Sequence, residues 1–134
     1  MLSKEEQAIN NHHDNMNCAQ SVLVAFSNEV NVDVDTLYKM MEGFGSGVSI
    51  GEVCGACTGM VSCISLLNST GINHKGESKH QTRLDTNKYM NKFIALNGSC
   101  ICRQLKANSV SCDKCIGDCA RLVEEYIKED NSNR

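Results

Sequence analysis

The 134-residue sequence lacks proline and tryptophan, and it also lacks a long apolar segment and an excess of basic residues. Its longest strongly apolar run covers only residues 22–26, whereas a helix that spans a bilayer needs about 20 apolar residues. Lys and Arg number 13 against 16 Asp and Glu, so the formal net charge is −3. Such a charge provides no electrostatic footprint for nucleic acid or for an anionic membrane. We therefore expect neither nucleic-acid binding nor membrane insertion.

The N-terminus also lacks the features of a secretory signal. Residues 1–6 read MLSKEE, which is polar and acidic where a signal peptide has a basic start and an apolar run. We therefore expect a cytoplasmic protein, and cytoplasmic thiols stay reduced. The cysteine count is 9, an odd number, so a complete disulfide framework is disfavoured twice over. The cysteines instead indicate metal or redox chemistry.

The length suits one compact domain over residues 1–134. Apolar periodicity and capping residues predict an all-α fold, a bundle of about six to seven helices with no convincing strand. Ser3 with Glu6, and Asn17 with Gln20, have the spacing of capping boxes at the first two helices, the second of which we extend through residue 29. The later helices are expected after Asp33 or Asp35, from near Glu52, over residues 79–96, after Ser99 and after Ser111.

Four cysteines fall close to the expected N-termini of helices: Cys18, Cys54, Cys102 and Cys112. Unpaired backbone N–H groups and the positive end of the helix dipole favour the thiolate form at such positions. The thiolate is the form that ligates metals and attacks electrophiles. If several of these helix ends converge, they would stabilise an anionic centre such as an iron–sulfur cluster.

The other five cysteines are Cys57, Cys63, Cys100, Cys115 and Cys119. Free cysteine is among the most buried residue types, so we expect these five to pack in the core. Helical spacing places Cys57, Cys115 and Cys119 one or two turns deeper than the four helix-start cysteines.

Two C-x-x-C pairs, Cys54 with Cys57 and Cys112 with Cys115, suggest alternatives. One is a zinc-binding structural module, although the gap between the pairs is far longer than in compact zinc modules. Another is a thiol–disulfide oxidoreductase, although the strand that precedes a thioredoxin-like motif is missing. Neither pair is followed by histidine, so covalent haem is not predicted.

Three glycines are candidates for the cofactor site. Gly45 belongs to a glycine-rich loop, and Gly55 and Gly59 interrupt an expected helix at a cost of about 1 kcal/mol each relative to alanine. Close approach of another helix or of a prosthetic group would compensate. We expect all three to let backbone amides reach the cysteine sulfurs. His12 and His13 could ligate a metal, but we expect them to form a solvated polar helix end.

The sequence resembles the C_GCAxxG_C_C family of redox-active proteins over nearly the whole chain. The residues that carry the resemblance are 17–22 (NCAQSV), 43–45 (GFG), 51–59 (GEVCGACTG), 102–105 (CRQL) and Cys112. The resemblance implies a redox role, often in anaerobes, with the family cysteines at Cys18, Cys54, Cys102 and Cys112. It also implies kinship with split-Soret cytochromes, in which these cysteines are associated with an iron–sulfur centre. The segment between Cys102 and Cys112 is short for the family, so Cys115 is the alternative fourth position.

The leading prediction is an electron-transfer protein rather than an enzyme that transforms a substrate. Its cofactor would be an iron–sulfur cluster, [2Fe–2S] or [4Fe–4S], held by Cys18, Cys54, Cys102 and Cys112. Its partner would be a redox protein that the sequence does not identify, and analogy alone allows a homodimer.

Overall fold

The computed structural model describes residues 1–132, and over that range the protein is all-helical with no β-strand. It contains eight α-helices, of which six have seven or more residues, in agreement with the predicted fold class. The α-helices are α1 (Lys4–His13), α2 (Cys18–Ala25), α3 (Ser27–Val30), α4 (Val34–Met40), α5 (Gly55–Asn68), α6 (Lys79–Asn97), α7 (Cys102–Ala107) and α8 (Cys112–Ser132). Three short turns, η1 (Glu42–Phe44), η2 (Gly47–Gly51) and η3 (Ile72–His74), complete the described chain.

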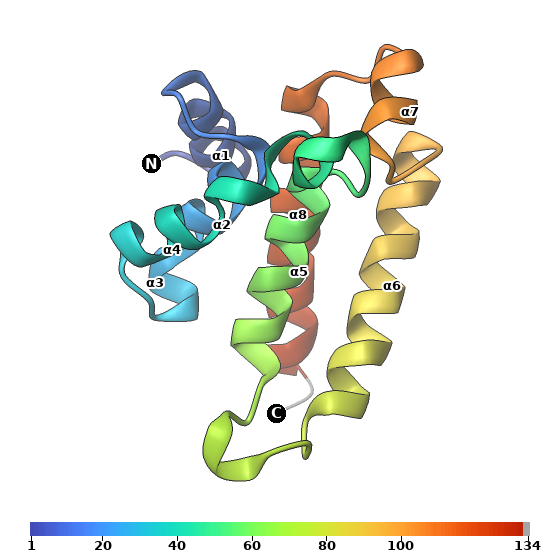
Figure 1. The fold of residues 1–134 in the computed structure, drawn as a ribbon. Helices are drawn as coiled ribbons and strands as arrows, with labels where there is room; N and C mark the ends of the chain where they lie inside the picture. Colours follow the sequence, from blue (N-terminus) through green and yellow to red (C-terminus); the bar gives the residue numbers. More distant parts are fainter. Residues whose placement is uncertain (133–134) are drawn as a thin grey trace.

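Helices α5 and α8 lie side by side in the middle of the bundle (Figure 1). Helix α6 packs against both on one side, and α1 to α4 form a layer on the other, where α1 contacts α8 and α2 contacts α5. The N-terminal ends of α5, α7 and α8 lie at the same end of the bundle (Figure 1). This arrangement brings together segments that are far apart in the sequence.

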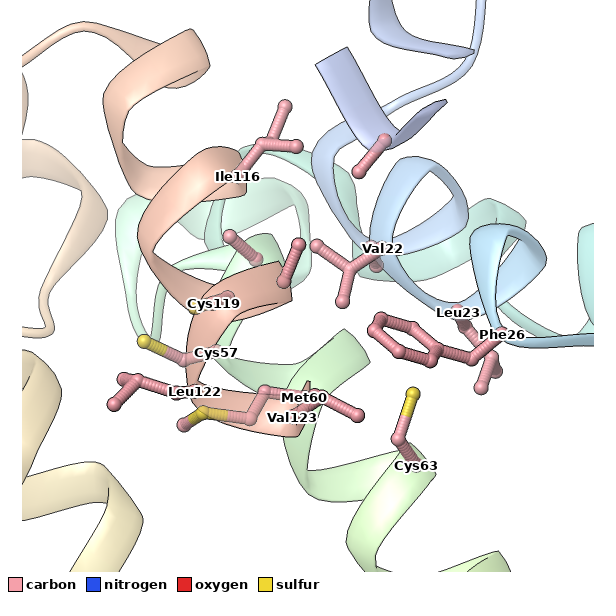
Figure 2. Close-up of a cluster of buried hydrophobic side chains, with 14 of the residues drawn as sticks. Val22, Leu23, Phe26, Cys57, Met60, Cys63, Ile116, Cys119, Leu122 and Val123 are labelled. Atoms are coloured by element: carbon pink, nitrogen blue, oxygen red, sulfur yellow. The ribbon is translucent and has the colours of Figure 1, made fainter. Parts of the chain in front are cut away.

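The core lies between α2, α5 and α8 and includes cysteines as well as aliphatic and aromatic side chains (Figure 2). One face of α8 lies in the core: Ile116, Cys119, Leu122, Val123 and Tyr126 are all buried, and Ile127 is half-buried. Burial of a large apolar side chain contributes about 1.5–3 kcal/mol to folding. The cysteine-bearing helices are therefore held by the main core of the protein.

Glycine allows α2 and α5 to approach each other closely. A Cβ on Gly59 would lie 2.8 Å from the carbonyl oxygen of Ala19 and 3.1 Å from the Cβ of Val22. A Cβ on Gly55 would lie 3.2 Å from the backbone nitrogen of Ala19. We expected the cost of these glycines to be offset by the close approach of another helix or of a prosthetic group. The structure shows the close approach of another helix.

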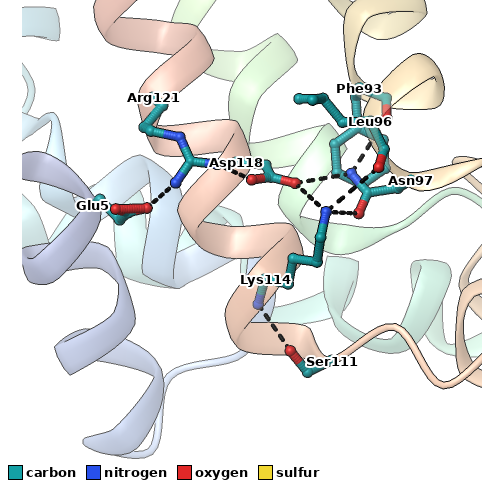
Figure 3. Close-up of polar contacts among 8 residues, drawn as sticks. All are labelled: Glu5, Phe93, Leu96, Asn97, Ser111, Lys114, Asp118 and Arg121. Carbon is teal, nitrogen blue, oxygen red and sulfur yellow. Dashed lines mark hydrogen bonds and ion pairs between the residues drawn. The ribbon is translucent and has the colours of Figure 1, made fainter.

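A buried carboxylate ties three helices together (Figure 3). Asp118 on α8 is 3% exposed. Its oxygens accept hydrogen bonds from Asn97 of α6 at 3.1 Å and from Lys114 at 2.8 Å, and they also pair with Arg121. Arg121 in turn pairs with Glu5 of α1. The network fixes α1 and α6 against the central helix α8.

Three predicted helix boundaries are wrong. The second helix ends at Ala25, and α3 is a separate helix because Phe26 departs from helical geometry at φ −104° and ψ 17°. Helix α5 begins at Gly55 rather than near Glu52, because Glu52 and Cys54 have non-helical backbone angles and Val53 between them pairs with Ile101. Helix α7 begins at Cys102 with Ile101 as its N-cap, so Ser99 does not cap it. Ser99 Oγ instead accepts a hydrogen bond from the Ile101 amide.

Within the described part of the chain, no helix has both the length and the apolar character that crossing a membrane requires.

Candidate metal centre

The four helix-start cysteines line a single small cavity of about 40 Å³. Cys18, Cys54, Cys102 and Cys112 each contribute to its wall, and Cys115 is a fifth cysteine on the same wall. Cys54 and Cys102 are 5% and 8% exposed, whereas Cys18 and Cys112 are half-buried. The cavity therefore has a deep side and a side closer to solvent.

Each of the four cysteines also lies at the start of a helix. Cys18, Cys102 and Cys112 are the first residues of α2, α7 and α8, and Cys54 is the N-cap of α5. The α2 start is fixed by a complete capping box, in which Asn17 accepts from the Gln20 amide and Gln20 accepts from the Asn17 amide. The positive dipole ends of four helices therefore border the cavity, which favours negative charge there.

A short backbone pairing sets the starts of α5 and α7 side by side. Val53 and Ile101 form an isolated antiparallel β-bridge. The Cys54 amide donates to the Cys100 carbonyl at 2.7 Å, and the Cys102 amide donates to the Glu52 carbonyl at 2.6 Å. Cys54 and Cys102 are therefore positioned by main-chain hydrogen bonds, independently of their side chains.

The glycine-rich loop forms a left-handed turn beside Cys102. Ser46, Gly47, Val48 and Ser49 all have positive φ, between 51° and 63°. Such a conformation is costly for non-glycine residues and most of all for a β-branched one such as Val48. A Cβ on Gly47 would lie 2.4 Å from the Glu52 nitrogen and 2.8 Å from the Cys102 Cβ, so only glycine fits. Sequence reasoning identified the loop but not Gly47 as its most constrained residue.

On the solvent side, the sulfurs of Cys18 and Cys112 lie within 4.8 Å of each other. Burial raises the pKa of Cys18, and the proximity of Cys112, Cys54 and Cys102 raises it further. In the metal-free protein the Cys18 thiol is therefore protonated. A metal ion that replaced such a proton would relieve the repulsion between neighbouring thiolates.

On the deep side, Cys54 is the sulfur that the fold stabilises as a thiolate. Hydrogen bonds from the thiols of Cys115 and Cys57 lower its pKa well below the usual range, and the Ala56 and Cys57 amides add to this effect against the cost of burial. Cys54 thus has the combination of helix N-terminus and donated hydrogen bonds that produces reactive or metal-binding cysteines.

The deeper cysteines behave as protonated core residues. Cys57, Cys63 and Cys119 are each 0% exposed, and Figure 2 shows them among the apolar side chains of the core. Hydrogen bonds to Cys119 and Cys54 raise the pKa of Cys57, and burial raises the pKa of both Cys63 and Cys119. The expectation of core packing is confirmed for these three and for Cys115, which is also buried, whereas Cys100 is half-buried.

Cys112 and Cys115, the two alternatives for the fourth position, face different sulfurs. The sulfur of Cys112 lies within 4.8 Å of that of Cys18, whereas the thiol of Cys115 lowers the pKa of Cys54. Cys115 is only 3% exposed, and its pKa is raised by donation to Cys54 and by burial. Cys112 begins α8, so it lies nearer than Cys115 to the positive end of the helix dipole.

His12, which we expected to be solvated, is held beside the cavity. Its Nδ1 lies 2.9 Å from Oδ1 of Asp113, and His13 Nε2 lies 2.7 Å from the other oxygen. One ring nitrogen of His12 and the sulfurs of Cys18 and Cys112 all lie within 4.8 Å of one another. The two histidines were visible in the sequence, but their partner is about 100 residues away.

The three candidate glycines have different surroundings. Gly55 lines the cavity. A Cβ on Gly45 would lie 2.8 Å from the Asn17 Cβ, and Gly59 faces Ala19. The close approaches of Gly45 and Gly59 are thus to protein atoms, and Gly55 alone of the three also borders the cavity.

A larger cavity of about 680 Å³ lies away from the cysteines, where the end of α5 faces the start of α6. Hydroxyl side chains such as Ser65, Thr70 and Thr82 line it together with Arg83, and it has no cysteine in its wall. Size alone therefore does not identify the chemically distinctive site. Four thiols at four helix N-termini are a donor set that fits a thiolate-bound metal or an iron–sulfur cluster.

Comparison with known proteins agrees with this description. No curated protein and no solved structure gives a significant match to the chain. A family model described as "Putative redox-active protein (C_GCAxxG_C_C)" matches residues 16–126, which include all four helix-start cysteines. The match covers most of the chain, and the protein belongs to the C_GCAxxG_C_C family.

Proposed function

We propose that the protein is an electron-transfer protein that holds an iron–sulfur cluster through Cys18, Cys54, Cys102 and Cys112. The observation that carries the proposal is that these cysteines come from four separate helix starts and line one cavity. Thiolates are the usual protein ligands of iron–sulfur clusters. The cluster type, [2Fe–2S] or [4Fe–4S], is left to experiment.

The surroundings of the four sulfurs suit an anionic centre. Helix N–H groups stabilise negative charge, and the hydrogen bonds to Cys54 already favour one thiolate. When bound, an iron–sulfur cluster supplies a redox couple whose potential depends on net charge, hydrogen bonds to sulfur and solvent exposure. In this chain, the half-buried sulfurs of Cys18 and Cys112 are the ones nearest to a redox partner protein in solution.

The experiment is reconstitution of the reduced protein with ferrous iron and sulfide in the absence of oxygen. Single Cys→Ser variants at positions 18, 54, 102 and 112 should each lose at least half of the bound iron and sulfide. Cys63→Ser is the matched control, because Cys63 is buried but does not line the cavity. Equal incorporation in all five variants would reject the assignment of ligands.

A second candidate function, thiol–disulfide exchange at Cys54 and Cys57, has one specific observation in its favour. Cys54 is the N-cap of α5, and its pKa is lowered by the thiols of Cys115 and Cys57 and by the backbone amides of Ala56 and Cys57. In such a reaction, the Cys54 thiolate attacks a substrate disulfide and expels one thiolate. Cys57 then displaces the second, so the substrate is reduced to two thiols as a Cys54–Cys57 disulfide forms.

The surroundings of Cys57 disfavour this alternative. Cys57 is 0% exposed, and its pKa is raised by hydrogen bonds to Cys119 and Cys54. The resolving step needs the Cys57 thiolate, which this environment opposes. We therefore favour electron transfer through a bound iron–sulfur cluster over thiol–disulfide exchange.

A further inference from the structure

We propose that His12, Cys18 and Cys112 form a binding site for a single divalent transition-metal ion, with Asp113 orienting the His12 ring. This inference goes beyond the proposed cluster, because it concerns one ion and requires neither iron nor sulfide. The two sites share Cys18 and Cys112. His12 lies outside residues 16–126, the part of the chain that the family model covers.

The three ligand atoms are already close to the spacing of a metal site. A ring nitrogen of His12 and the sulfurs of Cys18 and Cys112 lie within 4.8 Å of one another. In a tetrahedral site with metal–sulfur bonds of about 2.3 Å, ligand atoms lie about 3.8 Å apart. Closing around an ion therefore requires movements of about 1 Å or less, which side-chain rotation can provide.

The positions of the three ligands are set by packing rather than by the ligands themselves. Helix α1, which carries His12, is fixed by the Asn11 side chain, whose Nδ2 donates to the Ser21 carbonyl of α2 at 3.1 Å. It is also fixed by the pair between Glu5 and Arg121 of α8. Cys18 and Cys112 begin the two helices that these contacts hold. The site is thus built where three helices meet.

A metal-bound histidine usually donates its other ring N–H to a carboxylate or carbonyl group, and Asp113 supplies such a carboxylate for His12. Its Oδ1 lies 2.9 Å from His12 Nδ1, and a carboxylate at that nitrogen fixes the tautomer and leaves Nε2 for a metal. The His13 ring holds the other oxygen of Asp113 at 2.7 Å. His13 therefore steadies the carboxylate, whereas His12 is the histidine that faces the two thiols.

The donor set defines the class of ion. One imidazole and two thiolates suit borderline and soft ions such as Zn²⁺, Co²⁺ or Fe²⁺ and disfavour Mg²⁺ and Ca²⁺. All three ligands are half-buried, so an ion can reach them from solvent while part of its hydration shell is removed. The three protein ligands leave a fourth position open, as in many reactive zinc sites.

The test is a titration of the reduced, metal-free protein with Co²⁺ under anaerobic conditions. Absorption bands of thiolate-bound Co²⁺ report the affinity, and cobalt-edge X-ray absorption reports imidazole scattering. We expect one ion per chain, with affinity lowered at least about tenfold in His12→Ala. The His13→Ala and Cys54→Ser controls should stay within about twofold of the wild type, and Asp113→Asn should bind about tenfold more weakly.

Three results would overturn the inference. The wild type does not bind Co²⁺, the wild type and His12→Ala bind it with equal affinity, or Cys54→Ser loses binding while His12→Ala retains it. His12→Cys replaces the imidazole by another metal ligand. If His12→Ala binds weakly because it lacks a ligand, and not because it folds poorly, His12→Cys should restore the affinity for Co²⁺. Iron and sulfide uptake is measured separately. Failure of the wild type to take up a cluster would reject the proposed function and leave the Co²⁺ result standing.

Discussion

The amide of Cys54 donates a 2.7 Å hydrogen bond to the carbonyl oxygen of Cys100, two residues before Cys102. This bond belongs to the Val53–Ile101 bridge. It explains how two cysteines from distant parts of the chain come to line one cavity. Because the bond is between main-chain atoms, substitution of either cysteine side chain leaves it in place. Variants of Cys54 and Cys102 therefore retain this main-chain pairing and test the chemistry of the thiols.

Alanine at Cys57 or at Cys115 separates the two candidate functions. If the cluster is held by Cys18, Cys54, Cys102 and Cys112, both variants should retain iron and sulfide at levels close to those of the wild type. A thiol–disulfide oxidoreductase would instead lose its turnover in at least one of them. Metal content and reduction of a small disulfide substrate are measured on the same samples.

Loss of the cluster in Cys115→Ala with retention in Cys112→Ala would contradict the ligand set, because it would identify Cys115 as the fourth ligand. Both residues line the cavity, so the comparison is matched.

The thiolate character of Cys54 predicts an unusual pH dependence in the metal-free protein. Its pKa is lowered by hydrogen bonds, so the thiolate is already formed at pH 6 and its rate of alkylation should be nearly constant between pH 6 and 8. An ordinary thiol, with a pKa of about 8.5, reacts about tenfold faster for each pH unit in this range. Mass spectrometry of the labelled peptide gives the rate.

Cys57→Ala removes one of the hydrogen bonds to Cys54 and should bring back part of the pH dependence. Cys63→Ala, which makes no such bond, is the control. A rate for Cys54 that rises like that of an ordinary thiol in the wild type would show that the fold does not stabilise its thiolate.

Gly59→Ala should destabilise the protein by about 1–2 kcal/mol. The new methyl group would lie 2.8 Å from the Ala19 carbonyl oxygen, and overpacking of about 1–3 kcal/mol outweighs the gain of up to about 1 kcal/mol in helix propensity. Gly43→Ala is the matched control, since a Cβ there meets nothing within 4 Å. Urea unfolding of both variants measures the difference, and a Gly59→Ala protein as stable as Gly43→Ala would contradict the close approach of α2 and α5.

Asp118→Ala should cost about 2–3 kcal/mol, because it removes a buried carboxylate that accepts bonds from Asn97 and Lys114 and pairs with Arg121. Asp35→Ala removes an exposed acid paired with Lys39 and should cost less than about 0.5 kcal/mol. Thermal unfolding distinguishes them. Similar losses in the two variants would mean that the network in Figure 3 contributes little to stability.

Much of the fold was predictable because its signals are local. The caps at Asn17 and Ser111 each act within one helix and can be recognised without knowledge of the rest of the chain. The same local signals located the helix starts at Cys18 and Cys112. The start at Cys102 was predicted for a different reason than the one found, since Ile101 and not Ser99 is the cap.

The parts that sequence reasoning missed depend on contacts between distant residues. His12 meets Asp113 across the α1–α8 interface, and no periodicity in either helix reports that encounter. The left-handed turn around Gly47 depends on Glu52 and Cys102, which only the folded chain brings against it. The proximity of Cys115 to Cys54, which shifts the pKa of both thiols, also depends on a contact between distant parts of the chain.

The most direct test of the central claim is the iron, acid-labile sulfide and zinc content of protein purified without oxygen, together with its visible spectrum. The account predicts stoichiometric iron and sulfide and absorption that bleaches on reduction. Colourless protein that contains no iron, and that fails to take up a cluster on reconstitution, would contradict it. Bound zinc in that protein would then indicate a structural metal site at the same thiols.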